Sequence, residues 1–451
     1  MIENTENRSG EIALLTQKGG EQTPEKENIT LAVLSGGYNY QSAVVNFNRS
    51  SDKYHITIKD YMDSEGADAL SRADALAKLY ADIASGNCPD IVELTGLDTA
   101  NLAGKGAFED LAGYLEKSSL LDADDFVEEI LNAYTFNDQL VCIPSVFFLE
   151  TVVGDSRQVG EEPGWTLAEL ADLARAHPEA ELFDGAERED ILKFAMLYGE
   201  DAFIDWTTGE CRFDSEAFRE LLELVNSFPE KADRGSDQPT TPLRIQRGEV
   251  LLKEAWLYDF DSIQMDIEIF KGEATCIGFP SADGEGRHML ITGFAFAIPS
   301  GAGSKDGAWS FIESFLAKEC EKAPDGSQMG FPVAKRRLEA MIEKQTKVEY
   351  LLDENGEPVL DENGEPIILG NTQTSSSSDG WSYTYHTATM EEVDKILSLL
   401  DGAVLTGGSN DEIISIIIEE AEDYFAGQKT VGEVSEIIQN RVNIYVNENR
   451  H

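Results

Sequence analysis

The sequence predicts an α/β protein in which strands and helices alternate. Its 451 residues are long enough for roughly two or three domains of about 150 residues each. Hydrophobic residues make up 41% of the chain and charged residues 27%, which is the balance of a globular protein with a substantial core. Near the N-terminus, apolar runs of strand length alternate with a segment of helical periodicity. That alternation favours a parallel sheet with helices on its faces.

The first ordered elements carry this alternation. Residues 1–28 are polar and predict a disordered tether. An apolar run at 29–35 and a period-two pattern at 55–61 predict two strands. Apolar residues spaced three and four apart at 67–85 predict an amphipathic helix, and 91–94 predicts a third strand.

Most of the later helices have marked starts. A Ser or Thr followed three residues later by Glu forms a capping box, in which each side chain bonds the other residue's free backbone N–H. Four such pairs precede segments of helical periodicity: Thr166 and Glu169, Thr389 and Glu392, Ser409 and Glu412, Thr430 and Glu433. We also expect strands at 274–278 and 289–298, and a helix at 305–317.

A tandem octapeptide occupies residues 353–368, where DENGEPVL is followed by DENGEPII. Each Asn-Gly pair favours a tight turn, so the segment predicts a protruding β-hairpin. The Asp-x-Asn-Gly start resembles a calcium loop, but the twelfth position holds Gly364 where such a loop needs a bidentate glutamate. We therefore expect no metal here.

The net charge of the chain and the spacing of its cysteines and histidines argue against several classes of function. The 85 acidic residues outnumber the 35 basic ones, for a formal charge of −50, which repels phosphate backbones and anionic lipid. We expect no nucleic-acid partner. The five cysteines and five histidines form no CxxC or HExxH pair, so we expect neither a metal nor another cofactor. No apolar stretch is long enough to span a membrane, and no signal peptide is visible in the sequence as written.

A set of short segments follows a characteristic order along the chain. They are IASGNCPDIV at 83–92, FEDLAGYL at 108–115, DQLVCIP at 138–144, WTLAEL at 165–170, GFPSADG at 278–284, AWSF at 308–311, GFPV at 330–333 and YFAGQK at 424–429. In this order the chain resembles extracellular solute-binding proteins of the carbohydrate ABC-importer type (family 1), especially the long acidic versions of Gram-positive bacteria. It departs from them in having no N-terminal lipobox cysteine and in carrying Gln139 at the position of a turn glycine.

The resemblance implies a two-lobed, type II periplasmic-binding-protein-like fold, with a ligand cleft between lobes joined by a hinge. The crossings would lie near Pro144, Met289 and Pro332. Lobe 1 would comprise 29–143 plus 290–331, and lobe 2 would comprise 144–289 plus 332–451, with 353–368 as a hairpin insertion. The resemblance also implies a non-catalytic, monomeric, extracellular lipoprotein that delivers a sugar or oligosaccharide to the transmembrane subunits of an ABC permease.

Candidate ligand-binding residues combine aromatic surfaces with polar groups, because sugars present C–H faces and hydroxyl edges. They lie at strand ends, past the first crossing, and in two aromatic-rich segments: Tyr38, Tyr40, Thr95, Glu150, Trp256, Tyr258, Asp259, Gly293, Phe294, Trp381 and Tyr383. Packing is the alternative for the tyrosines and Trp256. Trp381 and Tyr383 share one face of an extended segment, and they either cover the core or line the cleft, with the cleft preferred.

Three other functions stay open from the sequence. A protein of the same fold could bind peptides, polyamines or another small solute in an acidic, aromatic cleft. A secreted glycoside hydrolase would use a pair of carboxylates, but no GxSxG, HExxH or P-loop motif singles out a reacting group. A surface adhesin would use the 353–368 hairpin to hold a protein partner.

Overall fold

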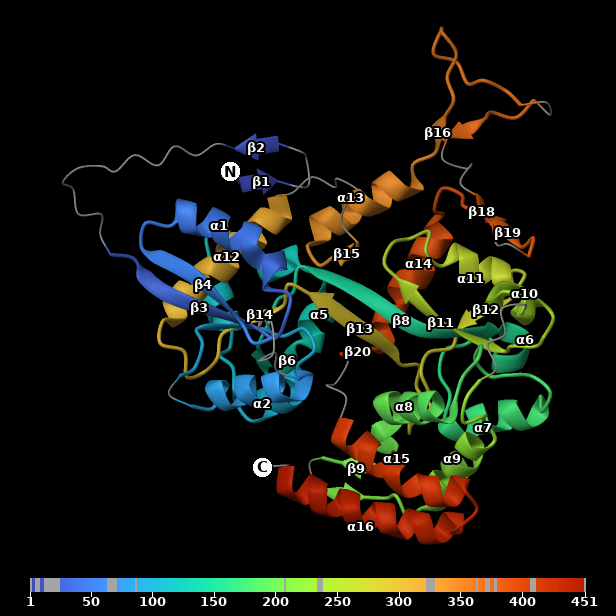
Figure 1. Cartoon of the computed structure of the whole chain (residues 1–451). Coiled ribbons are helices and arrows are strands. Elements are labelled where there is room, and N and C mark those ends of the chain that lie inside the picture. Colours follow the sequence, from blue (N-terminus) through green and yellow to red (C-terminus); the bar gives the residue numbers. More distant parts are fainter. Residues whose placement is uncertain are drawn as a thin grey trace.

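The computed structural model consists of two halves, each built on its own sheet (Figure 1). It describes residues 2–4, 9–11, 25–62, 71–85, 87–206, 208–232, 238–321, 329–361, 364–369, 374–376, 379–405 and 411–449. Among these residues, no helix combines the length and the apolar composition that a membrane crossing requires. The α/β class predicted from the sequence is confirmed.

The first sheet has the strand order β14-β5-β3-β4. Its strands are β3 (Glu27–Val33), β4 (Tyr54–Asp60), β5 (Ile91–Glu93) and β14 (Phe296–Ala297). Strand β3 runs parallel to both β4 and β5, whereas β14 is antiparallel to β5. Because the chain moves from β3 to one neighbour and then to the other, the carboxyl ends of β3 and β5 flank the point where the strand order reverses, which is where open α/β sheets bind ligands.

The second sheet is organised around one long central strand, β8 (Val146–Asp155). Strand β8 pairs antiparallel with four others, and a sixth strand pairs parallel with β13. These strands are β11 (Leu252–Leu257), β12 (Ala274–Cys276), β13 (His288–Gly293), β15 (Phe331–Pro332) and β20 (Ala403–Leu405).

Helices cover both sheets, and several form a separate layer in the second half (Figure 1). The helices of the first half are α1 (Gln41–Ser50), α2 (Arg72–Ile83), α3 (Thr99–Gly104), α4 (Ala112–Leu115), α5 (Glu128–Ala133) and α12 (Lys305–Glu321). Those of the second half are α6 (Ser156–Val159), α7 (Leu167–Ala176), α8 (Arg188–Gly199), α9 (Glu216–Asn226), α10 (Thr241–Gln246), α11 (Gln264–Ile269), α13 (Lys335–Thr346), α14 (Met390–Ser398), α15 (Asp411–Phe425) and α16 (Val431–Asn449). Helices α8, α9, α15 and α16 share a core of their own, apart from the core beneath the sheets.

Several local predictions are confirmed in the described residues. The capping boxes at Thr166, Thr389 and Thr430 form as expected, with each glutamate bonding back to the cap residue. The Ser409 cap lies outside the described residues. The predicted helix at 67–85 is α2, and its N-cap is Ser71, whose side chain accepts from the Asp74 N–H.

The single strand expected at 289–298 is wrong. Strand β13 ends at Gly293 in the second sheet, and β14 begins at Phe296 in the first. Between them Phe294 has a φ of 54°, in the left-handed region that an L-residue rarely adopts, which breaks strand geometry. The chain therefore changes sheets at Phe294 and not near Met289, and 290–293 belong to the second sheet.

The N-terminal segment also differs from expectation. Strands β1 (Ile2–Asn4) and β2 (Ser9–Glu11) pair within the N-terminal segment predicted to be disordered, and β3 begins at Glu27.

Small antiparallel pairs also form between β6 (Thr135–Phe136) and β7 (Gln139–Leu140), β9 (Ile204–Asp205) and β10 (Glu210–Cys211), and β18 (Thr374–Ser376) and β19 (Ser382–Thr384). Residues Asn137 and Asp138 both have positive φ, as a two-residue type I′ hairpin loop requires, so the turn forms without glycine at Gln139.

The tandem octapeptide projects from the molecule (Figure 1), but not as one hairpin. Strands β16 (Glu349–Tyr350) and β17 (Ile368–Leu369) close its base, and each octapeptide makes its own turn, with bridges from Leu352 to Pro358 and from Leu360 to Pro366. Its backbone also forms a ring of hydrogen bonds, from the Leu351 N–H to Ile367, from Val359 to Leu351, and from Ile367 to Val359. The eight-residue repeat gives this ring its regular spacing.

Candidate ligand-binding site

The first sheet contributes an edge formed by the carboxyl ends of β3 and β5. After β3 the chain turns through Gly36, whose φ of 73° suits glycine, and the Gly37 N–H donates to Asp60 Oδ2 at 2.8 Å. This turn leaves Tyr38 75% exposed and buries Tyr40. Of the two tyrosines predicted from the sequence, only Tyr38 is open to a ligand in this conformation.

A buried carboxylate, Glu93, ends strand β5 and was not predicted from the sequence. Thr95 donates to it twice, through its hydroxyl at 2.6 Å and its N–H at 3.2 Å. The Tyr40 hydroxyl and the Ala295 N–H also donate to it. Burial raises the pKa of Glu93 more than these hydrogen bonds lower it. The hydroxyl of Thr95 is therefore occupied within the protein.

The crossing from β13 to β14 packs against the same edge. The ring of Phe294 meets Tyr40 edge to face, with centroids 5.4 Å apart. The hydroxyls of Tyr134 and Thr292 share a short hydrogen bond beneath the crossing. The structure thus brings Tyr40, Thr95, Gly293 and Phe294 together, around Glu93.

The second sheet contributes a row of side chains across its strands. Trp256 on β11 pairs with Glu150 on β8, which pairs in turn with Met289 on β13. Directly paired residues of antiparallel strands lie on one face, so these three side chains form a line. Glu150 and Met289 are buried, whereas Trp256 is 52% exposed. Tyr258, two residues beyond Trp256, is also exposed.

Asp259 follows this row and is partly buried. Burial is the largest cause that raises its pKa, to about 7, and the neighbouring Asp261 carboxylate adds to the effect. No described residue bonds the buried Oδ1 of Asp259. The carboxyl group is thus held in an environment that disfavours its charge.

Trp381 and Tyr383, expected to line the cleft, are both buried. Their rings stack with centroids 6.4 Å apart, and the Tyr383 hydroxyl donates to Gln264 Oε1 at 2.6 Å. Gln264 is itself buried, and its amide nitrogen lies 3.3 Å from Glu392 Oε2 on α14. These contacts make Trp381 and Tyr383 part of the packing between α11 and α14, as the alternative interpretation stated.

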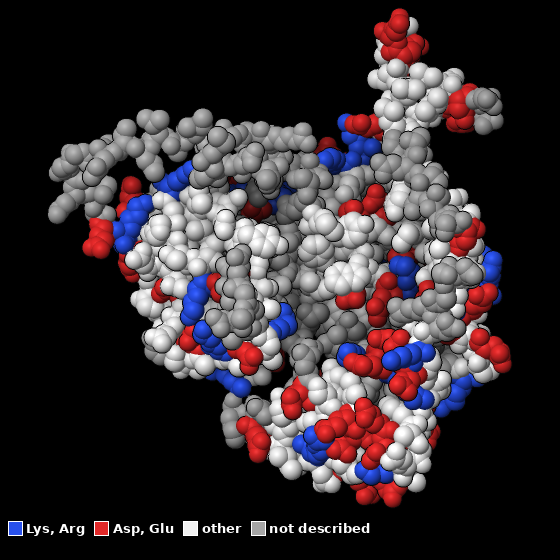
Figure 2. Space-filling model, viewed as in Figure 1, with Lys and Arg blue, Asp and Glu red and all other residues white. Residues whose placement is uncertain are grey.

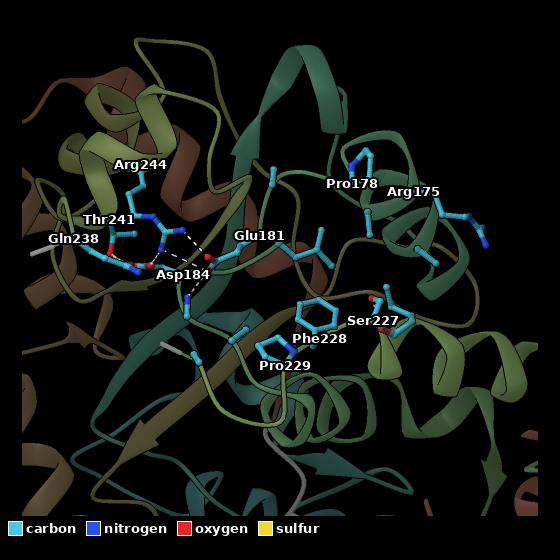
Figure 3. Close-up of a pocket in the computed structure, with 18 of the residues that line it drawn as sticks. Arg175, Pro178, Glu181, Asp184, Ser227, Phe228, Pro229, Gln238, Thr241 and Arg244 are labelled. Carbon is cyan, nitrogen blue, oxygen red and sulfur yellow. Dashed lines mark hydrogen bonds and ion pairs between the residues drawn. The ribbon is translucent and has the colours of Figure 1, made fainter. Parts of the chain in front are cut away.

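A large cavity lies elsewhere, within the second half of the molecule (Figure 3). Its volume is about 940 Å³, and it lies between α7, α9 and the start of α10. On one wall the buried guanidinium of Arg244 bonds both Glu181 and Asp184, and Thr241 also donates to Asp184. None of the ligand-binding residues predicted from the sequence lines this cavity.

Charge is unevenly distributed over the face that Figure 2 shows: acidic side chains gather on α15 and α16 and at the tips of the projecting octapeptides. Among the described residues, no cluster of His, Cys, Asp and Glu side chains could hold a metal ion. The described cysteines are all unpaired thiols.

The sequence and the fold were compared with those of known proteins. A family model described as a bacterial extracellular solute-binding protein matches residues 67–346. Among solved structures, the sugar-binding protein MalE from Xanthomonas citri is similar, with a TM-score of 0.53 at 12% identity over 94% of this chain and 98% of that one. The cyclic alpha-maltosyl-1,6-maltose binding protein from Arthrobacter globiformis has a TM-score of 0.48 at 15% identity, over 94% and 100% of the two chains. No curated protein matched the sequence.

Proposed function

The chain belongs to the bacterial extracellular solute-binding proteins, and from that premise we propose that it captures a sugar or oligosaccharide for import by an ABC transporter. Its partners in this role are the small-molecule solute and the transmembrane subunits of the permease. We further propose that the protein is a monomer without catalytic activity, and that its native form is anchored to the membrane by lipid.

The observation that carries the proposal is the line formed by Trp256, Glu150 and Met289 on the second sheet. An indole that is half exposed at the edge of a sheet offers a flat surface to the C–H face of a sugar ring. Carboxylate oxygens accept hydrogen bonds from sugar hydroxyls, and Glu150, opposite Trp256 in the strand register but buried, is a further proposed contact. The solved structures named above are sugar-binding proteins by their titles, which supports the same class of solute.

The second side of the site comes from the first sheet, where Tyr38 is exposed beside the carboxyl ends of β3 and β5. We propose that a ligand lies between this edge and the Trp256 row, and that the halves close on it as two lobes joined near Pro144, Phe294 and Pro332. Closure is favoured only by the amount by which the closed state binds the solute more tightly. Gly293, Phe294, Tyr258 and Asp259 remain proposed contacts of the same cleft.

A thermal-shift screen tests the proposal. The protein is unfolded with mono- and oligosaccharides, and with peptides and polyamines as controls for other solute classes. A solute at a hundred times its Kd adds about 2.7 kcal/mol of stability, a shift of a few degrees. We expect a sugar to shift the wild type and the control variant Trp206→Ala, because Trp206 lies in the β9–β10 region, but not Trp256→Ala.

Other outcomes separate the alternatives. If only peptides or polyamines shift the melting temperature, the proposal that the solute is a sugar is wrong, but the protein still binds a small solute. Binding of a protein partner that is lost on deletion of 353–368 but retained in Trp256→Ala would favour an adhesin. Hydrolysis of a bound oligosaccharide would contradict the non-catalytic role.

A further inference from the structure

One face of strand β11 continues from Trp256 toward helix α8. Side chains alternate along a strand, so Leu252, Glu254 and Trp256 point to the same side of the sheet. Glu254 and Trp256 are exposed, whereas Leu252 is buried. The rise of a strand places the Cα atoms of Glu254 and Trp256 about 6.6 Å apart. Any group that binds at Glu254 is thus next to the indole proposed as the stacking surface.

A hollow of about 430 Å³ opens beside this face, between β11 and α8. Leu252 and Glu254 form one wall, and Asp190, Lys193 and Phe194 of α8 form the other. This volume lies within the range of about 300–1,000 Å³ that small-molecule sites occupy. The hollow meets the larger cavity of Figure 3 at Asp184 and Thr241, which line both.

The floor of the hollow is apolar and preformed. The rings of Phe183 and Phe194 pack against each other with centroids 5.1 Å apart, and Phe194 also contacts Phe279 at 5.4 Å. Phe194 and Phe279 are buried in the core that lies behind the second sheet. The hollow therefore does not depend on a ligand to order its walls.

Its polar groups are mainly hydrogen-bond acceptors. Asp190 and Glu254 both line the hollow, and the partial burial of Glu254 raises its pKa, as does the negative charge of Asp190. Two lysines also line the hollow, but each is paired with a carboxylate: Lys193 with Glu189 at 2.5 Å and Lys253 with Asp266 at 2.6 Å. One oxygen of Asp190 accepts from the Glu187 N–H at the start of α8, and no described residue donates to the carboxylate of Glu254. A ligand suited to this hollow brings hydrogen-bond donors without negative charge.

We propose that this hollow is a subsite that extends the ligand surface beyond Trp256, and that the solute is an oligosaccharide rather than a single sugar. One ring stacks on Trp256, and the hydroxyls of a following ring donate to Glu254 and Asp190. This inference rests on the proposed function, and it adds to that function the length of the solute and two residues that recognise it.

Isothermal titration of the full chain with sugars of increasing length tests the inference. The probes are the maltose, cellobiose and xylobiose series, each with two, three and four rings. In the series that binds, we expect the affinity to rise at least tenfold from two rings to four. Equal affinity at every length would overturn the subsite while leaving the proposed function intact. Absence of binding by every member would overturn both.

Substitutions in the hollow test whether its side chains produce the gain in affinity with sugar length. Glu254→Gln keeps the shape of the side chain, and we expect it to remove most of the gain for longer members while leaving the affinity for the two-ring member within twofold. Ala186→Trp, which fills the hollow, should do the same. The control Glu216→Gln changes an exposed glutamate at the start of α9 and should match the wild type at every length. An equal loss at all lengths in Glu254→Gln would overturn the subsite, and thermal unfolding verifies that each variant is folded.

Discussion

The two sides of the candidate site differ in how their polar groups are satisfied. On the first sheet, the carboxylate of Glu93 accepts from Thr95, Tyr40 and a backbone N–H, so its hydrogen-bonding capacity is used within the protein. On the second sheet, Trp256 is half exposed and the buried Oδ1 of Asp259 has no partner among the described residues. We infer that the first side acts as a rigid support and that the second provides most of the contacts with a solute.

The largest effect should be the loss of stability that follows when the buried carboxylate of Glu93 is removed from the first side of the site. Glu93→Ala leaves the Thr95 hydroxyl and the Tyr40 hydroxyl without their acceptor in a buried place, and we expect a loss of about 3 kcal/mol in the free energy of unfolding. Denaturant unfolding measures it. Glu93→Gln, which keeps an acceptor oxygen, should lose less. Equal losses in the two variants would show that the hydrogen bonds contribute little.

On the second sheet, removing the exposed indole of Trp256 should weaken ligand binding but have little effect on stability. Trp256→Ala should weaken binding of the sugar found in the screen by about 2 kcal/mol, roughly thirtyfold, because it removes the stacking surface. Its unfolding free energy should fall by less than about 1 kcal/mol, since half of the side chain is already exposed. Titration calorimetry and denaturant unfolding measure the two quantities. A large loss of stability with unchanged affinity would assign Trp256 to the core.

The pH dependence should also come from the second side. The pKa of Asp259 is raised to about 7 from an ordinary 3.8, so between these values the folded state retains a proton that the unfolded state has released. Stability therefore falls as pH rises from about 4 to about 7. Asp259→Asn removes this penalty, and we expect the variant to gain about 1–2 kcal/mol over the wild type at pH 8, after solvent screening, and nothing at pH 4.

Thermal unfolding of both proteins across this pH range measures the difference. Because buried His288, whose pKa is lowered to about 4, titrates in both proteins, its contribution cancels in the comparison. A constant difference between the two proteins at every pH would contradict the assignment to Asp259.

The smallest effect concerns the aromatic pair that proved to be buried. Tyr383→Phe removes one buried hydrogen bond, to Gln264, and should cost about 1 kcal/mol of stability. Because Tyr383 packs between α11 and α14, sugar affinity should stay unchanged. A clear loss of affinity would return Tyr383 to the cleft, as the sequence suggested.

Local features of the fold could be predicted because they depend on near neighbours in the chain. The capping boxes at Thr166, Thr389 and Thr430 need only residues three apart, and the strands and helices of the first sheet follow from their periodicity. Which of the candidate site residues are exposed could not be predicted in this way, and their role in binding stays a prediction. Trp256, Tyr258 and Tyr38 are exposed as a binding role requires, but Tyr40, Trp381 and Tyr383 are buried.

Glu93 was missed although the sequence held a signal for it. A charged residue inside the apolar run at 91–94 must find partners when the strand is buried, and its donors come from Tyr40, Thr95 and Ala295. Likewise, Glu254 and Asp190 are 64 residues apart, and only the packing of α8 on β11 brings them to one hollow.

The sequence by itself thus determined the α/β class, the family resemblance, the helix starts and the acidic surface, because composition and short-range patterns encode them. The tertiary structure decided where the chain passes between sheets, which aromatic side chains are exposed, and which carboxylates meet. These depend on pairing between distant strands, as at Phe294, where one apolar run serves two sheets. Burial and register are properties of that pairing, and no local pattern specifies them.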